Sequence, residues 1–280
     1  MRWQGRPGSG NIEDRRGMGG MALPVGGGIG GLVLLLLFSA LTGTNPLDMI
    51  NGSEPSTENV GTTGVSDSDP QAEFIAVVLK DTEDIWQQIF RERGLTYQPP
   101  VLVLFTQATQ SACGVGQSAM GPFYCPNDRK VYLDLSFFRE LDDRFGASGD
   151  FAQAYVVAHE VGHHIQTITG ISQRVQNARR GASERQGNQL SVRMELQADC
   201  YAGVWGHHAA QRNLLDPGDA EEGMRAAAAI GDDRLQQQGQ GRVVPESFTH
   251  GSSEDRVSWL RRGMENGKIE ACDTFNEGTF

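Results

Sequence analysis

Two histidines and a glutamate with a fixed spacing are the residues of this chain best suited to chemistry. His159, Glu160 and His163 form the pattern His-Glu-x-x-His. In a helix, residues i and i+4 lie one turn apart on the same face, so both imidazoles can bind one zinc ion. Glu160 is rotated by one residue and can reach a water that the metal activates. The pattern therefore predicts a zinc-dependent hydrolase with Glu160 as the general base.

A third ligand must come from elsewhere, because a hydrolytic zinc site has three protein ligands and one open position. Glu195 and Asp199 lie four residues apart in a later segment of helical pattern. We expect Glu195 to be the third ligand. Asp199, one turn further on, could accept a hydrogen bond from the far ring nitrogen of a ligating histidine and so fix its tautomer. The alternative is a pair of exposed acidic side chains on a helix face.

The element that must position the motif is a helix over residues 150–169, with Ser148 or Asp150 as its cap. Apolar spacing predicts further helices over residues 71–94, 136–145, 189–213, 218–239 and 253–264. Short apolar runs predict strands over residues 101–105 and 130–134, and residues 117–124 could add an extended segment. The expected fold is α+β and mostly helical, with a small antiparallel sheet.

Composition restricts the partners of the chain. It has 280 residues, enough for one domain with a full core, and its 35 acidic residues against 24 basic ones give a formal net charge of −11. Without a basic field, nucleic acid is excluded as a partner. Glycines are concentrated near the N-terminus, which predicts that this end lies outside the packed domain.

An uncharged apolar segment follows the first 20 residues. Residues 21–43 are long enough for one transmembrane helix, and arginines precede them while no basic residue follows before Lys80. This asymmetry predicts a cytoplasmic N-terminal segment over residues 1–20 and a catalytic domain on the periplasmic or extracellular side. A cleaved signal peptide is the alternative interpretation.

The segment after the apolar run is polar and acidic. Residues 44–70 read as a flexible spacer, which leaves residues 71–280 as the folded domain. All four cysteines fall in that domain, where disulfides persist if it lies outside the cytoplasm. No two cysteines have the close spacing of a thiolate zinc site, so disulfides are favoured over metal binding. Of the three possible pairings we favour Cys113 with Cys125, which closes a short loop between strands, and Cys200 with Cys272, which ties the C-terminal tail to a helix.

The combination of His159-Glu160-x-x-His163 with Glu195-x-x-Ala198-Asp199 resembles the gluzincin group of zinc metallopeptidases. The segments 10–17, 121–126, 131–134 and 247–253, together with the single apolar span, are similar to the bacterial membrane-anchored "putative neutral zinc metallopeptidase" family. This resemblance implies a zincin-like domain, one Zn²⁺ per chain and a protein or peptide substrate. It also implies that an edge strand, here residues 117–124, pairs with extended substrate.

Several histidines lie outside the motif. Thr249-His250-Gly251 with the downstream Arg256 is similar to a segment that approaches the site in integral-membrane gluzincins, so His250 could stabilise the oxyanion; capping a helix is its alternative role. His164 points about 100° away from the ligand face. His207 and His208 are expected to be structural or exposed.

Two other functions fit the same motif. One is a non-catalytic, membrane-tethered scaffold in which zinc joins two helices, although such a closed site would need a fourth protein ligand and no Glu160. The other is a zinc hydrolase that acts on a non-peptide amide of the envelope.

Overall fold

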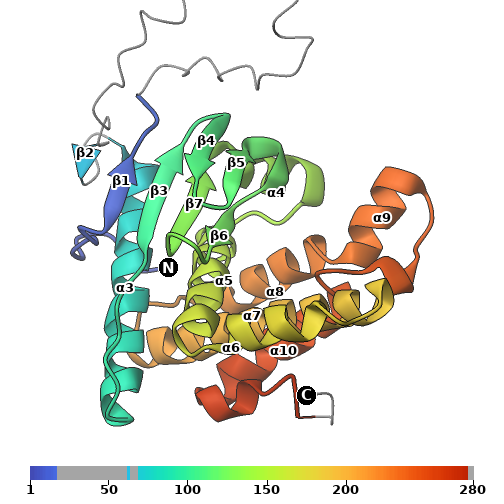
Figure 1. Ribbon diagram of the computed structural model, residues 1–280. Coiled ribbons are helices and arrows are strands. Elements are labelled where there is room, and N and C mark those ends of the chain that lie inside the picture. The colour runs from blue at the N-terminus through green and yellow to red at the C-terminus, as the bar shows by residue number, and fades with distance from the viewer. Residues whose placement is uncertain (18–61, 64–68, 277–280) are drawn as a thin grey trace, which may run out of the picture.

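Two apolar runs form the central strands of the sheet. β3 (Val101–Phe105) and β7 (Lys130–Asp134) occupy the predicted positions and pair in parallel, with Val103 opposite Tyr132. The computed structural model describes residues 1–17, 62–63 and 69–276, and in it the strands gather at one end of the molecule, above the helices (Figure 1).

The sheet is mixed, so the prediction of an antiparallel sheet is wrong. Its order is β2-β1-β3-β7-β6, where β1 is Ile12–Asp14, β2 is Thr62–Thr63 and β6 is Phe123–Cys125. β1, β3 and β7 run parallel to each other, and the edge strands β2 and β6 are antiparallel to their neighbours. A parallel pair needs a long connection, which α3 (Pro70–Glu92) supplies between β1 and β3. Residues 106–129 supply it between β3 and β7.

The N-terminal residues belong to the packed domain, and the expectation that they lie outside it is wrong for residues 1–17. Ile12 is fully buried in the main core. Ser9 and Asn11 both donate hydrogen bonds to the carboxylate of Glu83 on α3. Arg16 forms an ion pair with Asp69, the residue that caps the start of α3.

The two faces of the sheet are covered differently. Leu102, Leu104, Val131 and Leu133 point into the main core with the apolar residues of α3 and of α5 (Asp150–Ile168). The alternate residues form a small second cluster with Phe123. On that second face, the close fit of Gly116 against the Phe123 ring shows that the hairpin of β4 (Ala108–Ser111) and β5 (Gly114–Gln117) packs there.

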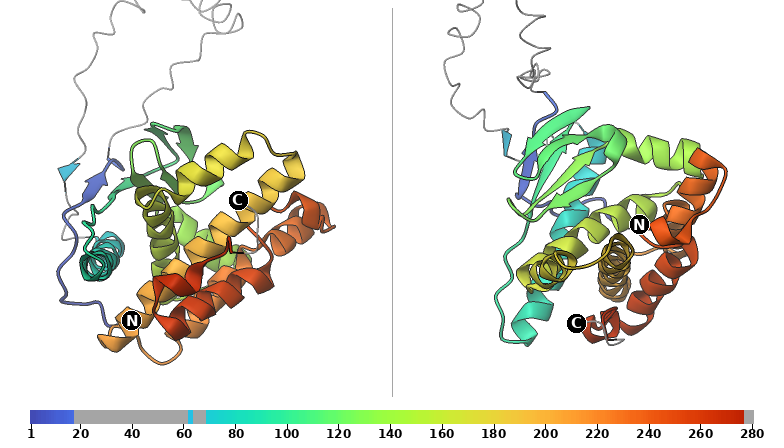
Figure 2. Two further views of the ribbon diagram at one scale, coloured as in Figure 1. Left: turned by 60° about the horizontal axis from the view of Figure 1, so that its bottom comes forward. Right: turned by 45° about the vertical axis from the view of Figure 1, so that its right-hand side comes forward.

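The extended segment expected over residues 117–124 is divided. Gln117 ends β5, Ser118–Met120 is a 3-10 helix, and only β6 joins the main sheet. β6 pairs with β7 alone, so among the described strands it is an edge of the sheet on the side of α5 (Figure 2).

Most predicted helices are present. α4 (Ser136–Phe145), α5 and α10 (Ser253–Asn266) lie where their apolar spacing placed them. α7 (Glu184–Gln211) begins five residues before its predicted start at residue 189, behind a capping box at Ser183. α6 (Ile171–Arg179) was not predicted, and residues 218–239 form two helices, α8 (Asp219–Ala229) and α9 (Asp232–Gln240). The N-cap of α5 is Gly149, with no capping side chain.

Both expected disulfides are present. Cys113–Cys125 joins the turn of the β4–β5 hairpin to β6, and Cys200–Cys272 joins α7 to the short 3-10 helix Ile269–Cys272. Within residues 1–17, 62–63 and 69–276, no helix combines the length and the apolar character that a membrane crossing requires. The predicted transmembrane residues 21–43 and most of the predicted spacer lie outside the described residues.

Candidate metal centre

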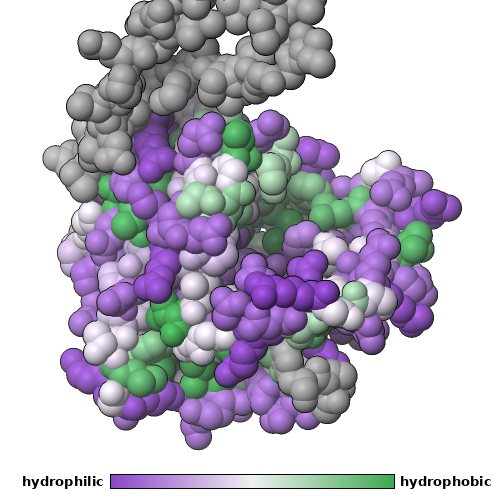
Figure 3. Space-filling view, in the orientation of Figure 1, coloured by the Kyte–Doolittle hydropathy of each residue, from purple (hydrophilic) through white to green (hydrophobic). Residues whose placement is uncertain are grey.

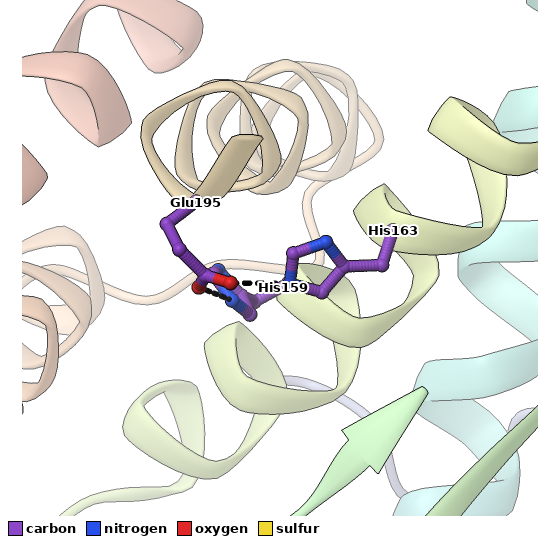
Figure 4. A group of neighbouring side chains, drawn as sticks. All are labelled: His159, His163 and Glu195. Carbon is purple, nitrogen blue, oxygen red and sulfur yellow. Dashed lines mark hydrogen bonds and ion pairs between the residues drawn. The ribbon is translucent and has the colours of Figure 1, made fainter. Parts of the chain in front are cut away.

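Three side chains from two helices meet at one point between α5 and α7. His159 and His163 come from α5 and Glu195 comes from α7 (Figure 4). The Nε2 atom of His159 is 3.1 Å from Oε2 of Glu195, and the Nε2 atom of His163 is 3.4 Å from Oε1 of the same carboxylate. These are the residues that the sequence proposed as ligands, and the fold brings all three together.

The donor set fits zinc in chemistry and spacing. Two imidazole nitrogens and a carboxylate are the donors of a catalytic zinc site, at metal distances of about 2.0–2.2 Å. Tetrahedral ligands at that distance lie roughly 3.3 Å from one another, which matches the two separations above. The side chains of His163 and Glu195 each keep 18% of their surface exposed, so the group is open to solvent on one side.

A close contact between the two ligand-bearing helices makes this geometry possible. A Cβ atom added to Gly162 would lie 2.9 Å from the carbonyl oxygen of Ala198 and 3.0 Å from its Cα. Only glycine allows the backbones of α5 and α7 to approach this closely. The glycine between the motif histidines and the alanine before Asp199 therefore set the distance between His163 and Glu195.

Asp199 holds the far nitrogen of His159, in the place the sequence predicted. Its Oδ1 atom is 2.8 Å from Nδ1 of His159 and accepts a hydrogen bond from the Tyr155 hydroxyl at 2.6 Å. Arg256, from α10, donates to both carboxylate oxygens at 2.9 and 3.0 Å and to the Tyr155 hydroxyl at 3.1 Å. Asp199 is fully buried, so this guanidinium supplies the countercharge that its ionised form needs.

The charges around the site shift the pKa values of its residues in the metal-free protein. Burial acts to lower the pKa of His159, but the charge and hydrogen bond of Asp199, with the hydrogen bond of Glu195, outweigh it and raise that pKa to about 10. Burial raises the pKa of Glu160, and the nearby His159 and His163 oppose this shift. Glu160 is 7% exposed and follows His159 directly, so a carboxyl group with enhanced basicity lies beside the ligands.

His250 lies on the loop before α10 and is oriented by Asp232, the first residue of α9. Its Nδ1 atom is 3.1 Å from Oδ1 of Asp232, and the other oxygen of that carboxylate accepts hydrogen bonds from the backbone N–H groups of Thr249, His250 and Gly251. The hydrogen bond to Asp232 raises the pKa of His250, and the charge of Glu195 adds to this effect. The His250 side chain is 52% exposed, so its ring is accessible to solvent.

The remaining histidines take part in packing. His164 is 1% exposed, and its ring lies between the carbonyl oxygen of Gln98 and the hydroxyl of Tyr124 on β6. His207 and His208 bind the backbone carbonyls of Met264 and Gly267. Arg256 is 2% exposed and donates a hydrogen bond to Asp199.

Sequence reasoning missed three residues that contact the site: Tyr155, Gln166 and Asp232. Tyr155 lies one turn before His159, and Gln166 lies three residues after His163. Tyr155 finds its partner, Asp199, on α7. Gln166 bonds His163 on its own helix and also bonds two groups of α7. Asp232 is near His250 only because α9 folds back on the loop before α10.

The chain is a mostly helical α+β protein in which a His-Glu-x-x-His helix and a glutamate from a second helix form a candidate metal site. The family model described as "Putative neutral zinc metallopeptidase" matches residues 1–275, so the chain belongs to that family.

Relatives of the chain are found in distant bacteria. The uncharacterized protein YpfJ of Escherichia coli (strain K12) is 50% identical over 286 residues, and the match covers 99% of each chain. The uncharacterized protein Rv2575 of Mycobacterium tuberculosis (strain H37Rv) is 44% identical over 191 residues, which is 64% of each chain. No solved structure matches the chain.

Proposed function

We propose that this protein is a membrane-anchored zinc peptidase that hydrolyses peptide bonds with His159, His163 and Glu195 as ligands. The observation that carries the proposal is the convergence of these three side chains beside Glu160. A structural zinc site would be closed by a fourth protein ligand, whereas this group keeps an exposed side. Membership of the metallopeptidase family supports a peptide as substrate.

The residues of the chain divide the chemistry among them. Zinc supplies a Lewis acid that activates water at neutral pH. Glu160 takes the proton of the attacking water and delivers it to the nitrogen of the leaving amine. His250, held by Asp232, donates a hydrogen bond to the oxyanion that develops on the substrate carbonyl. Asp199 and Arg256 keep the His159 ring oriented throughout.

The surface leaves room for an extended substrate. Figure 3 shows a hollow between α4 and β5 on one side and α7 on the other, with apolar residues in its depth. β6 borders α5 and its outer edge pairs with no other described strand. A peptide added along β6 would form backbone hydrogen bonds that do not depend on its sequence.

The location outside the cytoplasm is part of the proposal. It is supported by the two disulfides, since such bonds persist in oxidising compartments and are rare in the cytosol. The apolar character of residues 21–43 supports their role as the membrane anchor.

The test compares the detergent-solubilised full chain with its Glu160→Gln variant. We expect the wild type to hold about one zinc ion and to cleave an unfolded protein such as reduced casein. Glu160→Gln should retain the zinc and lose about 10²- to 10⁴-fold in rate, because only the base is removed.

Glu140→Gln is the matched control, because Glu140 is an exposed residue of α4 in an ion pair with Arg144 and should leave the rate unchanged. His250→Ala should keep zinc and lower kcat by about 10²- to 10³-fold. Normal cleavage by Glu160→Gln would rule out this mechanism, and a zinc-loaded wild type that cleaves no peptide bond would favour a scaffold or a non-peptide amide as substrate.

A further inference from the structure

His163 has its own orienting group, and it differs in kind from that of His159. The Nδ1 atom of His163 is 2.9 Å from Oε1 of Gln166, one turn further along α5. His159 meets a carboxylate at the same ring position, in Asp199. Gln166 is fully buried. A buried amide costs free energy unless all of its groups are hydrogen-bonded, so its partners decide what it contributes.

The partners of Gln166 lie on the helix that carries Glu195. Its Nε2 atom donates to the carbonyl oxygen of Met194 at 2.7 Å and to Oε1 of Gln197 at 3.1 Å. Met194 and Gln197 are on either side of Glu195 in the sequence of α7. One side chain of α5 is therefore bonded both to a histidine ligand and to the turn of α7 that bears the carboxylate ligand.

The second glutamine fixes the orientation of the first. Gln197 is 4% exposed, and its Nε2 atom donates at 2.9 Å to the carbonyl oxygen of Cys272, the residue tied to α7 by a disulfide. A carbonyl oxygen can only accept, so the NH₂ group of Gln197 must face Cys272 and its oxygen must face Gln166. By the same rule, the NH₂ group of Gln166 faces Met194 and Gln197, and its oxygen faces His163.

The orientations of Gln197 and Gln166 determine which ring nitrogen of His163 carries the proton. Because Oε1 of Gln166 has only lone pairs, Nδ1 of His163 must carry the hydrogen. In the neutral ring, Nε2 is then unprotonated and directed at Glu195, which is the form that binds a metal. We propose that Gln166, held in one orientation by Gln197, Met194 and the Cys272 carbonyl, is the positioning residue that selects the metal-binding tautomer of His163.

The proposal rests on the zinc site of the proposed function but not on its hydrolytic chemistry. A merely structural role would ask only that the buried volume be filled, which methionine does at similar size without hydrogen bonds. A positioning role asks for an acceptor facing Nδ1 of His163, which glutamate supplies and methionine lacks. The two roles thus make opposite predictions for Gln166→Met and Gln166→Glu.

The experiment measures zinc affinity of the full chain by competition with a chelator, together with the melting temperature of the zinc-free protein. We expect Gln166→Met to weaken zinc binding by about 10- to 100-fold while the zinc-free protein melts close to the wild type. Gln166→Glu should bind zinc within a few-fold of the wild type, even if its buried charge lowers the melting temperature. Gln197→Leu should lose less affinity than Gln166→Met, since it frees the orientation of Gln166 without removing it.

Gln153→Met is the matched control. Gln153 also lies on α5, and within the described residues its side chain forms one hydrogen bond, to Gln71. This substitution should leave zinc affinity unchanged. Wild-type affinity in Gln166→Met, or a greater loss in Gln166→Glu than in Gln166→Met, would overturn the proposal. A wild type that binds zinc but cleaves nothing would refute the proposed function alone, and the ranking of the variants would still decide the role of Gln166.

Discussion

At the scale of single residues, the two histidines proposed as zinc ligands have partners of different charge. Asp199 is an ionised carboxylate shared by His159, Tyr155 and Arg256, whereas Gln166 is a neutral amide. A carboxylate raises the basicity of its imidazole more than an amide does, so His159 should be the stronger zinc ligand.

Asp199→Asn tests this dependence. The change keeps the shape of the side chain but removes the charge, so we expect zinc affinity to fall by about 10- to 100-fold with the three ligands intact. Chelator competition measures the loss. The control is Asp134→Asn, which alters another buried aspartate, at the end of β7, and should leave zinc affinity unchanged. Asp134 accepts hydrogen bonds from the Ser118 hydroxyl and from the backbone N–H groups of Gln107 and Ser136. An equal loss in both variants would mean that Asp199 acts through general stability.

His164 makes the stability of the zinc-free protein depend on pH. Burial lowers its pKa from 6.5 to about 4, and the charge of Arg129 acts in the same direction. The unfolded chain therefore takes up a proton at a pH where the folded protein does not. The neutral, buried form of His164 therefore stabilises the fold fully above pH 6.5. As the pH falls toward 4, the free energy of unfolding decreases by about 3 kcal/mol on account of this residue.

His164→Gln should remove that contribution to the pH dependence, because a neutral amide can still bond Gln98 and Tyr124. Denaturant unfolding at pH 7, 5.5 and 4 measures the difference between the variant and the wild type. An unchanged slope between pH 6.5 and 4 in the variant would show that other groups dominate the acid response.

At the scale of elements, the distance between α5 and α7 decides whether a metal centre exists. Gly162→Ala would place a methyl group against the backbone of Ala198, so one helix must move. We expect a loss of about 1–3 kcal/mol in the free energy of unfolding, with zinc binding weakened beyond the effect on stability. Gly239→Ala in α9 is the control, because a Cβ there meets nothing within 4 Å and should be neutral or stabilising. Wild-type zinc affinity in Gly162→Ala would show that the helix contact does not set the ligand geometry.

Local pattern predicted the elements that bury a continuous apolar stripe. α4 and α5 match within a residue because their apolar positions recur at helical spacing. The break between α8 and α9 escaped this reasoning, because it falls at Gly231, whose place is set by contact with the backbone of Ser253 on another helix. β1 escaped as well, since Ile12 is its single fully buried residue and it sits among charged and glycine residues.

The ligand set was predictable for a related reason. His159 and His163 are four residues apart on α5, and Glu195 and Asp199 are four residues apart on α7. Helix geometry converts each of these spacings into a shared face. The bonds of Gln166 to α7, the contact of Asp232 with His250 and the contact of Arg256 with Asp199 join segments that are separated in the chain. No short-range pattern encodes such contacts.

At the scale of the whole molecule, the sheet restricts how the chain can lie at a membrane. β1 pairs with β3 over three residues. The ion pair between Arg16 and Asp69 holds the end of the N-terminal segment next to the start of α3. While β1 stays in the sheet, residues 1–17 and the metal centre lie on one side of any membrane. A single pass by residues 21–43, as the flanking arginines predict, would put them on opposite sides.

The structure therefore predicts that a thiol reagent that cannot cross the membrane reaches both residues 1–17 and the domain, or neither of them. Gln4→Cys and Gln238→Cys place thiols at exposed positions of the two parts, and the four native cysteines are all in disulfides, so background labelling should be low. With the domain outside, a membrane-impermeant maleimide should label both variants to the same extent in intact spheroplasts. Labelling of Gln238→Cys alone would mean that β1 leaves the sheet in the membrane-bound protein and that the arginines set a single-pass topology. If both variants were labelled only after lysis, the two parts would still lie on the same side of the membrane. The metal centre would then be in the cytoplasm, which would contradict the location that the disulfides support.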